Sequence, residues 1–135
     1  MFVLNVLATF LSGYYNRNAK VKELLEAYND EFRDADTIIS LLNDVAIYVN
    51  NMELGPRSIW HNKANFFSLV VESAWNYTNL IDPATAAGKL GALENELPPE
   101  YGLAAREAVN NRNQRLLRGG YVKAALTDEP LQLPA

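Results

Sequence analysis

Apolar residues recur at alternating steps of three and four between positions 35 and 52, which is the clearest pattern in the chain. This spacing places them on one side of a helix. Shorter stretches of the same period, bounded by polar, Gly or Pro residues, predict further helices at about 1–12, 20–32, 62–77, 99–109 and 113–126, with a short, Ala-rich helix after Asp82-Pro83. No stretch alternates with the period of two that a half-buried strand requires. The sequence therefore predicts an all-α fold, an irregular bundle of about five to seven helices.

Several short motifs predict where these helices begin and end. Gly13 is suited to the left-handed position that closes a helix. Asp82-Pro83 combines a capping side chain with a proline in the first turn, which favours a helix start. Gly119-Gly120 is expected to loosen or break the last helix. Residues 1–126 are thus expected to form one helical domain, and residues 127–135, with two prolines, a disordered tail.

Length and composition restrict the class of protein. The chain has 135 residues, about half of them apolar, and no cysteine, so it suits one domain without disulfides or thiolate metal sites. The apolar run at 2–11 is interrupted by Asn5 and Thr9 and is too short to span a bilayer. We expect no membrane partner and a cytoplasmic protein. An apolar helix at the very start also predicts a fragment of a longer protein, with self-association through residues 2–11.

The charge of the chain is unevenly distributed. Positions 23–44 contain seven acidic residues and one arginine, whereas positions 101–126 contain five basic residues and one glutamate. The net charge of −4 argues against a general nucleic-acid coat protein. The molecule is therefore expected to be acidic early and basic late.

Two mixed stretches of amide, basic and aromatic residues stand out among the ordinary amphipathic helices. They are Arg57-Ser58-Ile59-Trp60-His61-Asn62-Lys63-Ala64-Asn65-Phe66-Phe67 and Asn110-Asn111-Arg112-Asn113-Gln114-Arg115-Leu116-Leu117-Arg118. In the first, Trp60, Phe66 and Phe67 are expected in the core, while Arg57, His61 and Lys63 are expected at the surface.

The three arginines of the second stretch are the strongest candidate for a binding site. Arg112, Arg115 and Arg118 follow each other at steps of three, which favours one side of a helix. Guanidinium groups bind phosphates and carboxylates in a bidentate manner, and Asn110 and Asn111 would add amide donors near the helix start. We predict a ligand or partner contact surface here, extended by His61 and Lys63. A solvated basic face, or salt bridges to the acidic early helices, is the alternative.

Searches for catalytic or metal chemistry find nothing comparable. His61 is the only histidine, which disfavours zinc. Glu23, Glu26 and Asp30 lie along one helix side and are more simply a solvated face than a cation site. No nucleophile elbow, phosphate-binding loop or dinucleotide fingerprint is present. We therefore expect no enzyme activity, no metal and no cofactor.

The same segments resemble a known family, the C-terminal helical half of GmrSD-type, ParB-like proteins of restriction and phage-defence systems. The apolar helix and turn at Phe2–Tyr15, with the segment Leu24–Phe32, are similar to the family's opening helices. Ser58–Leu69 resembles its Lys-x-x-Phe-(Phe/Tyr)-x-Leu helix, and Asn110–Arg118 its Asn-rich turn followed by Arg-x-x-Arg. The resemblance extends over residues 1–126.

The resemblance also implies what the chain lacks. The family's Asp-Gly-Gln-Gln-Arg signature, which lies in the catalytic N-terminal half, is absent from this sequence, so no catalytic residue carries over. What the resemblance implies is a non-catalytic accessory module, a fragment or split piece, that packs on a ParB-like catalytic half in cis or in trans. DNA or a nucleotide would be bound with that half. The alternative is a free-standing acidic helical module that binds another protein.

Overall fold

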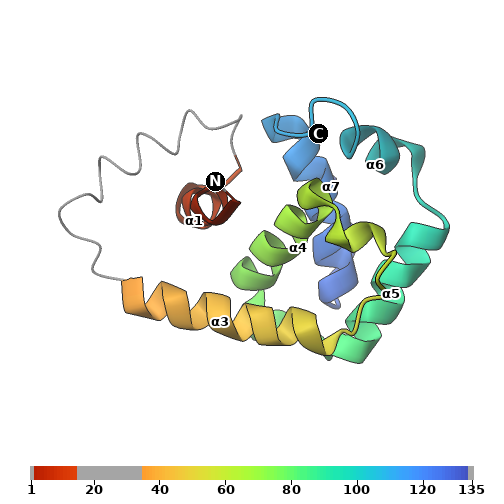
Figure 1. The fold of residues 1–135 in the computed structure, drawn as a ribbon. Coiled ribbons are helices and arrows are strands. Elements are labelled where there is room, and N and C mark those ends of the chain that lie inside the picture. Colours follow the sequence, from red (N-terminus) through yellow and green to blue (C-terminus); the bar gives the residue numbers. More distant parts are fainter. Residues whose placement is uncertain (1, 15–34, 134–135) are drawn as a thin grey trace.

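The computed structural model describes residues 2–14 and 35–133, and within them the chain is helical without a β-strand. This confirms the all-α prediction. Six α-helices and two short 3₁₀ turns lie in the described part (Figure 1). They are α1 (Phe2–Ser12), α3 (Ala35–Asn51), η1 (Ile59–His61), α4 (Lys63–Trp75), η2 (Tyr77–Asn79), α5 (Pro83–Asn95), α6 (Pro99–Ala104) and α7 (Arg112–Leu126).

Local signals in the sequence account for several of these boundaries. Helix α1 ends at Ser12, and Gly13 follows with a φ of +88°, the left-handed conformation that glycine adopts without strain. Helix α5 begins after Asp82, whose side chain accepts a hydrogen bond of 2.9 Å from the Thr85 N–H. The predicted helix at 20–32 lies outside the described residues.

Helices α4 and α7 form the centre of the bundle. They pack side by side, with α5 and α6 against α7 and with α1 and α3 against α4 (Figure 1). Helix α1 therefore lies on one side of the α4–α7 pair, and α5 and α6 lie on the other. Every other described α-helix packs against at least one helix of this central pair.

The main core is built around aromatic residues whose polar atoms are hydrogen-bonded, as burial requires. Trp60 Nε1 donates to the Leu90 carbonyl at 3.2 Å, and the Tyr101 hydroxyl donates to Asn65 Oδ1 at 2.8 Å. The Trp60 and Tyr101 rings meet edge to face. The prediction of a core position is confirmed for Trp60 and Phe67, while Phe66 is only partly buried.

A smaller apolar cluster joins α1 to α4. Val6 of α1 packs with Phe67 and Val71 of α4, and Val6 and Ala8 are each only 3% exposed. The apolar face of the first helix is thus used inside the chain. Self-association through residues 2–11 stays a prediction, since Phe2, Leu7 and Phe10 are only partly buried.

Two further expectations differ from the structure. Helix α6 ends at Ala104 rather than near Val109, because the chain turns through Ala108 with a positive φ of 49°. Helix α7 runs unbroken through Gly119 and Gly120. Both glycines lie where the chain passes closely: a Cβ on Gly119 would lie 2.8 Å from Glu72 Oε2, and one on Gly120 would lie 2.7 Å from the Gln132 carbonyl oxygen. They serve close packing and do not interrupt the helix.

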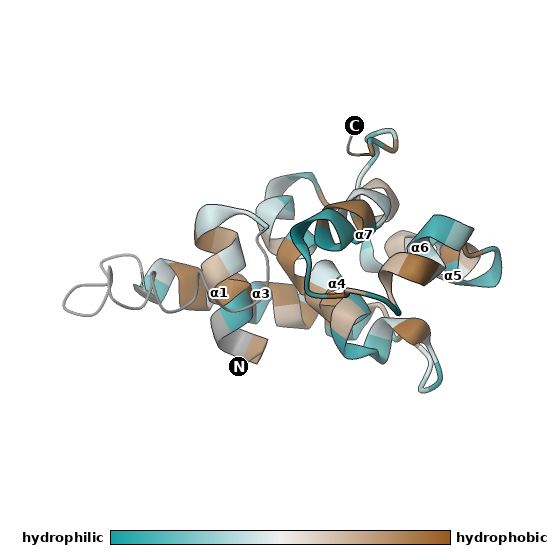
Figure 2. Cartoon of the chain, turned by 90° about the horizontal axis from the view of Figure 1, so that it is seen from above, coloured by the Kyte–Doolittle hydropathy of each residue, from teal (hydrophilic) through white to brown (hydrophobic). Residues whose placement is uncertain are grey.

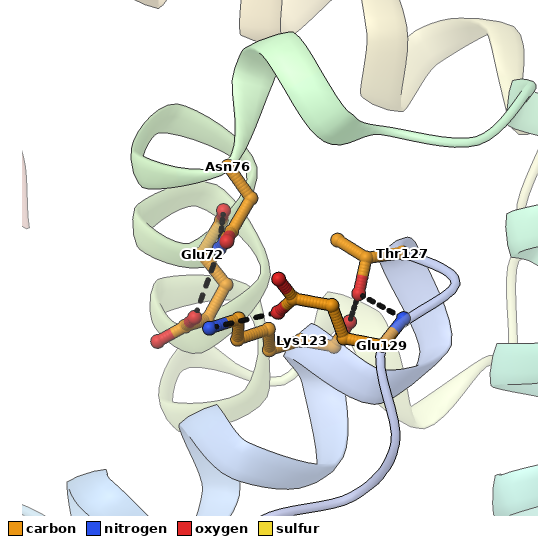
Figure 3. A network of polar contacts seen from close by, with 5 residues as sticks. All are labelled: Glu72, Asn76, Lys123, Thr127 and Glu129. Atoms are coloured by element: carbon orange, nitrogen blue, oxygen red, sulfur yellow. Dashed lines mark hydrogen bonds and ion pairs between the residues drawn. The ribbon is translucent and has the colours of Figure 1, made fainter.

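The segment after α7 is held against the helix over its first residues. Thr127 is buried, its carbonyl accepts from Lys89 Nζ at 3.2 Å, and its hydroxyl accepts from the Glu129 N–H at 3.2 Å. Lys123 and Glu129 form an ion pair of 3.0 Å (Figure 3). These contacts tie residues 127–129 to α5 and α7, while the disorder predicted for the tail stays a prediction. Residues 134–135 lie outside the described part.

The close approach at Gly119 predicts a strong response to one methyl group. In Gly119→Ala the new Cβ would lie 2.5 Å from the Tyr14 hydroxyl and 2.8 Å from Glu72 Oε2, so packing must shift. We expect a loss of about 1–3 kcal/mol in the free energy of unfolding. Gly88→Ala is the matched control, since nothing lies within 4 Å of that site. It should gain up to about 1 kcal/mol. Urea denaturation of both variants measures this, and equal stabilities would contradict it.

Candidate anion-binding pocket

The three arginines predicted to share one exposed surface do not do so. Arg112 is exposed, whereas Arg115 and Arg118 are only 3% and 1% exposed. The reason is geometric. Successive residues of an α-helix are separated by about 100°, so positions 112 and 118 differ by about 120° around the axis. The row of arginines therefore turns from the surface toward α4, and the predicted surface is corrected to a partly enclosed site.

Arg118 is anchored by neutral oxygen atoms. Its guanidinium donates to the carbonyls of Ala104 at 2.6 Å and Val109 at 2.8 Å, and more weakly to Ser68 Oγ at 3.4 Å. Burial lowers the pKa of Arg118, and the positive charge of nearby Arg115 lowers it further. A guanidinium nevertheless keeps its proton in proteins. Arg118 thus brings a positive charge into the interior and fixes the α6–α7 connection.

Arg115 lies one helical step earlier and is fixed by a different set of contacts. Its Cζ atom lies 4.6 Å from the centroid of the Phe67 ring, a cation–π arrangement. Its Nη2 donates to Asn110 Oδ1 at 3.5 Å. The ring of α4 and the amide of the connection therefore restrict the position of this guanidinium.

A cavity of about 180 Å³ lies between these residues. Helix α1, the start of α4, the α6–α7 connection and α7 all contribute walls. The lining residues are Phe2, Asn5, Lys63, Ala64, Phe67, Val109, Asn110, Arg115 and Arg118. Three of them are basic and two carry amides, and none of these lining residues is acidic. The positive end of the α4 dipole adds to this potential. The arrangement favours a small anion.

The cavity brings together four of the seven predicted site residues, namely Lys63, Asn110, Arg115 and Arg118. Asn111 and Arg112 are exposed at the start of α7, where Figure 2 shows a largely hydrophilic ribbon, and they do not line the cavity. Sequence reasoning missed Asn5 as a wall residue. Its signal was the polar interruption of an otherwise apolar helix.

His61 lies at a different site. It is exposed as predicted, and its Nε2 lies 2.9 Å from the Gly55 carbonyl oxygen. It borders a second cavity of about 580 Å³ between α1, α3 and α4. That cavity is mostly apolar, with Asn50, Glu53 and His61 near the C-terminal end of α3. His61 is therefore separate from the cationic pocket, contrary to the expectation of one extended surface.

The second polar cluster in the interior surrounds Glu72 of α4. Its carboxylate accepts from the Tyr14 hydroxyl at 2.7 Å. It also accepts from Asn76 Nδ2 at 3.2 Å (Figure 3). Burial raises the pKa of Glu72, while these hydrogen bonds and the charge of Lys123 lower it to a smaller extent. Burial, the negative charge of Glu72 and the hydrogen bond to it also raise the pKa of Tyr14. The cluster holds the end of α1 against α4 and α7.

Two other kinds of feature are absent from the described residues. They contain no group of three or more metal-ligating His, Cys, Asp or Glu side chains. None of their helices is long and apolar enough to cross a membrane. The proposed acidic face at Glu23, Glu26 and Asp30 lies outside the described part of the chain.

Comparison with known proteins gives no further assignment. No family model matches the chain, and neither a curated protein nor a solved structure matches it. The fold and the site define a small all-α protein with a partly enclosed cationic pocket.

The anchoring of Arg118 predicts a large effect of removing its charge. Arg118→Met leaves the Ala104 and Val109 carbonyls without their donors, so we expect a loss of about 3 kcal/mol in the free energy of unfolding. Arg57→Met is the matched control, because Arg57 is exposed. It should change stability by less than about 0.5 kcal/mol. Chemical denaturation distinguishes the two, and a harmless Arg118→Met would show that the guanidinium is not an anchor.

The raised pKa of Glu72 predicts a pH-dependent difference between the wild type and Glu72→Gln. Because the folded chain holds this proton more tightly than the unfolded chain, its stabilisation is complete at low pH and is lost as pH rises through the folded pKa. The wild type should therefore lose stability relative to Glu72→Gln as the pH rises above about 4, the ordinary range of a glutamate pKa. Unfolding free energies as a function of pH measure the effect, with exposed Glu96→Gln as the control for losing one charge. A difference that stays constant with pH would contradict it.

Proposed function

We propose that this chain is a non-catalytic helical module that binds an anionic group in the pocket of Lys63, Asn110, Arg115 and Arg118. The observation that carries the proposal is a cavity with three cationic side chains and no acidic residue among those that line it. One of these cations, Arg118, is almost completely buried among neutral oxygen atoms, at a large desolvation cost. An anion in the cavity would offset part of that cost.

The chemistry of the pocket suits binding rather than catalysis. Arginine does not deprotonate in proteins, and asparagine neither accepts nor releases a proton near neutral pH. The pocket therefore supplies hydrogen-bond donors and positive potential, but no general base. Together with the missing Asp-Gly-Gln-Gln-Arg signature, this supports an accessory role.

The resemblance to GmrSD-type proteins suggests the context of that role. In this proposal the chain is an accessory module of a DNA-targeting restriction or phage-defence protein, as a fragment or split piece. It packs on a ParB-like catalytic half in cis or in trans, and the pocket contacts DNA or a nucleotide bound there. A neighbouring reading frame that encodes Asp-Gly-Gln-Gln-Arg would support this context.

A protein-interaction module is the second candidate, and one observation favours it. Ile39 and Ile47 of α3 are 55% and 60% exposed. Asp36 and Asn43 share this exposed side of the helix. Exposed apolar residues with an acidic neighbour suit a partner with a basic and apolar surface. The interaction module would bind its partner through the exposed side of α3, whereas the accessory module would bind its ligand in the cationic pocket.

The proposal predicts anion binding without turnover. A fluorescent oligonucleotide should bind the purified chain, and Lys63→Gln should weaken binding several-fold and lower the salt slope by about 1. Lys89→Gln, which removes the same charge on α5, should leave binding unchanged. Fluorescence anisotropy at several salt concentrations measures both.

The same samples, incubated with nucleotides and modified DNA with added divalent metal ions, should show no hydrolysis. Metal-dependent cleavage would overturn the non-catalytic assignment. Absence of any binding, or an equal effect of the two lysine substitutions, would overturn the role of the pocket and favour the interaction module.

A further inference from the structure

We propose that the cavity between Lys63, Arg115 and Arg118 binds one phosphomonoester group, the terminal phosphate of a nucleotide or nucleic-acid strand, in preference to phosphodiesters within a strand. This inference rests on the proposed function, because it names the ligand of the same pocket.

The size of the cavity limits what can enter. Its volume of about 180 Å³ lies below the roughly 300–1,000 Å³ typical of sites that enclose a drug-sized ligand. Four segments of the chain form its walls, and two of its cations are almost fully buried. A single tetrahedral group at the end of a molecule suits such a space. A phosphate within a continuous strand carries a substituent on both sides and reaches an enclosed position less easily.

The charge of the cavity also favours a terminal phosphate. A phosphomonoester carries about −1.5 to −2 at pH 7 and presents three acceptor oxygens, whereas a phosphodiester carries a single charge. The three cationic side chains, with no acidic residue among the described residues that line the cavity, interact more strongly with the higher charge. The Asn5 and Asn110 amides offer further polar contacts to the oxygens.

The cationic groups are already positioned before a ligand arrives. Arg118 is fixed by two backbone carbonyls, and Arg115 by the Phe67 ring and Asn110. Lys63, in contrast, is exposed at the start of α4. Little side-chain freedom is therefore lost by the arginines on binding. Lys63 is the group that can adjust to the incoming anion.

The pH dependence of binding should belong to the ligand. Among the described residues, the charged groups that line the cavity are Lys63 from α4 and Arg115 and Arg118 from α7, while α1 and the α6–α7 connection contribute no ionisable lining residue. The reference pKa values of lysine and arginine lie well above pH 8. A phosphomonoester, in contrast, takes up its second proton near about pH 6.

Calorimetric titration of the full chain with thymidine 5′-monophosphate, thymidine and inorganic phosphate tests this directly. The monophosphate should bind about tenfold more weakly at pH 5 than at pH 7.5, because its dianion is protonated. Sulfate, which remains a dianion, is the control for changes in the protein itself and should bind equally at both pH values. Thymidine should not bind. Equal affinity for inorganic phosphate would support recognition of the phosphate group alone, and nucleoside-driven binding would overturn the inference.

Oligonucleotides with and without a 5′-phosphate separate this inference from the proposed function. The phosphorylated strand should bind at least several-fold more tightly, and Lys63→Gln and Arg115→Lys should remove that advantage while Lys89→Gln retains it. Arg115→Lys keeps the charge but loses the planar guanidinium fork. If circular dichroism shows that this variant is folded, its weaker binding can be assigned to the missing fork. If both strands bind equally and Lys63→Gln weakens both, the terminal-phosphate inference fails and the anion pocket stands. If neither strand binds, both fail.

Discussion

The site depends on one interaction, the burial of the Arg118 guanidinium among backbone carbonyls. A charged group in the interior is tolerated only when its donors are satisfied, and Arg118 satisfies them with the carbonyls of Ala104 and Val109 and with Ser68 Oγ. These partners belong to the end of α6, the connection to α7, and α4. One side chain of α7 thereby fixes three segments. The wall that carries Asn110 exists because of this attachment.

Close packing next to Arg118 extends the same arrangement to α1. Gly119 has no side chain, so Tyr14 and Glu72 approach the α7 backbone where a methyl group would collide. The Tyr14–Glu72 hydrogen bond of 2.7 Å then holds the end of α1 against α4. With α1 in this position, Phe2 and Asn5 complete the cavity. Two adjacent residues of α7, an arginine and a glycine, thus place separate walls of the pocket.

The sequence was sufficient wherever a local signal determines the structure. The three-and-four periodicity of residues 35–52 gave α3, and the Asp82-Pro83 pair gave the start of α5, because capping and amphipathicity act within one or two turns. The sequence was not sufficient where contacts between helices determine which side chains are buried. The helical step places Arg112 and Arg118 about 120° apart, but the packing of α7 against its neighbours decides which of the two is buried. Gly119-Gly120 likewise resembled a helix break, but it permits close approach.

This outcome changes how the cationic residues divide their roles. Arg118 donates its shortest hydrogen bonds to the Ala104 and Val109 carbonyls, so it contributes mainly positive potential to the cavity. Arg115 is oriented by the Phe67 ring and lies between that interior charge and the surface. Lys63 is exposed and mobile by the nature of its side chain, so it is the group best placed to meet an anion first. In the proposed function, an anion would meet the charge of Lys63 at the surface first and that of Arg118 in the interior last, losing water on the way. A solvated basic face would provide the first of these contacts but not the buried ones, which is why the enclosed arrangement favours a compact, highly charged group.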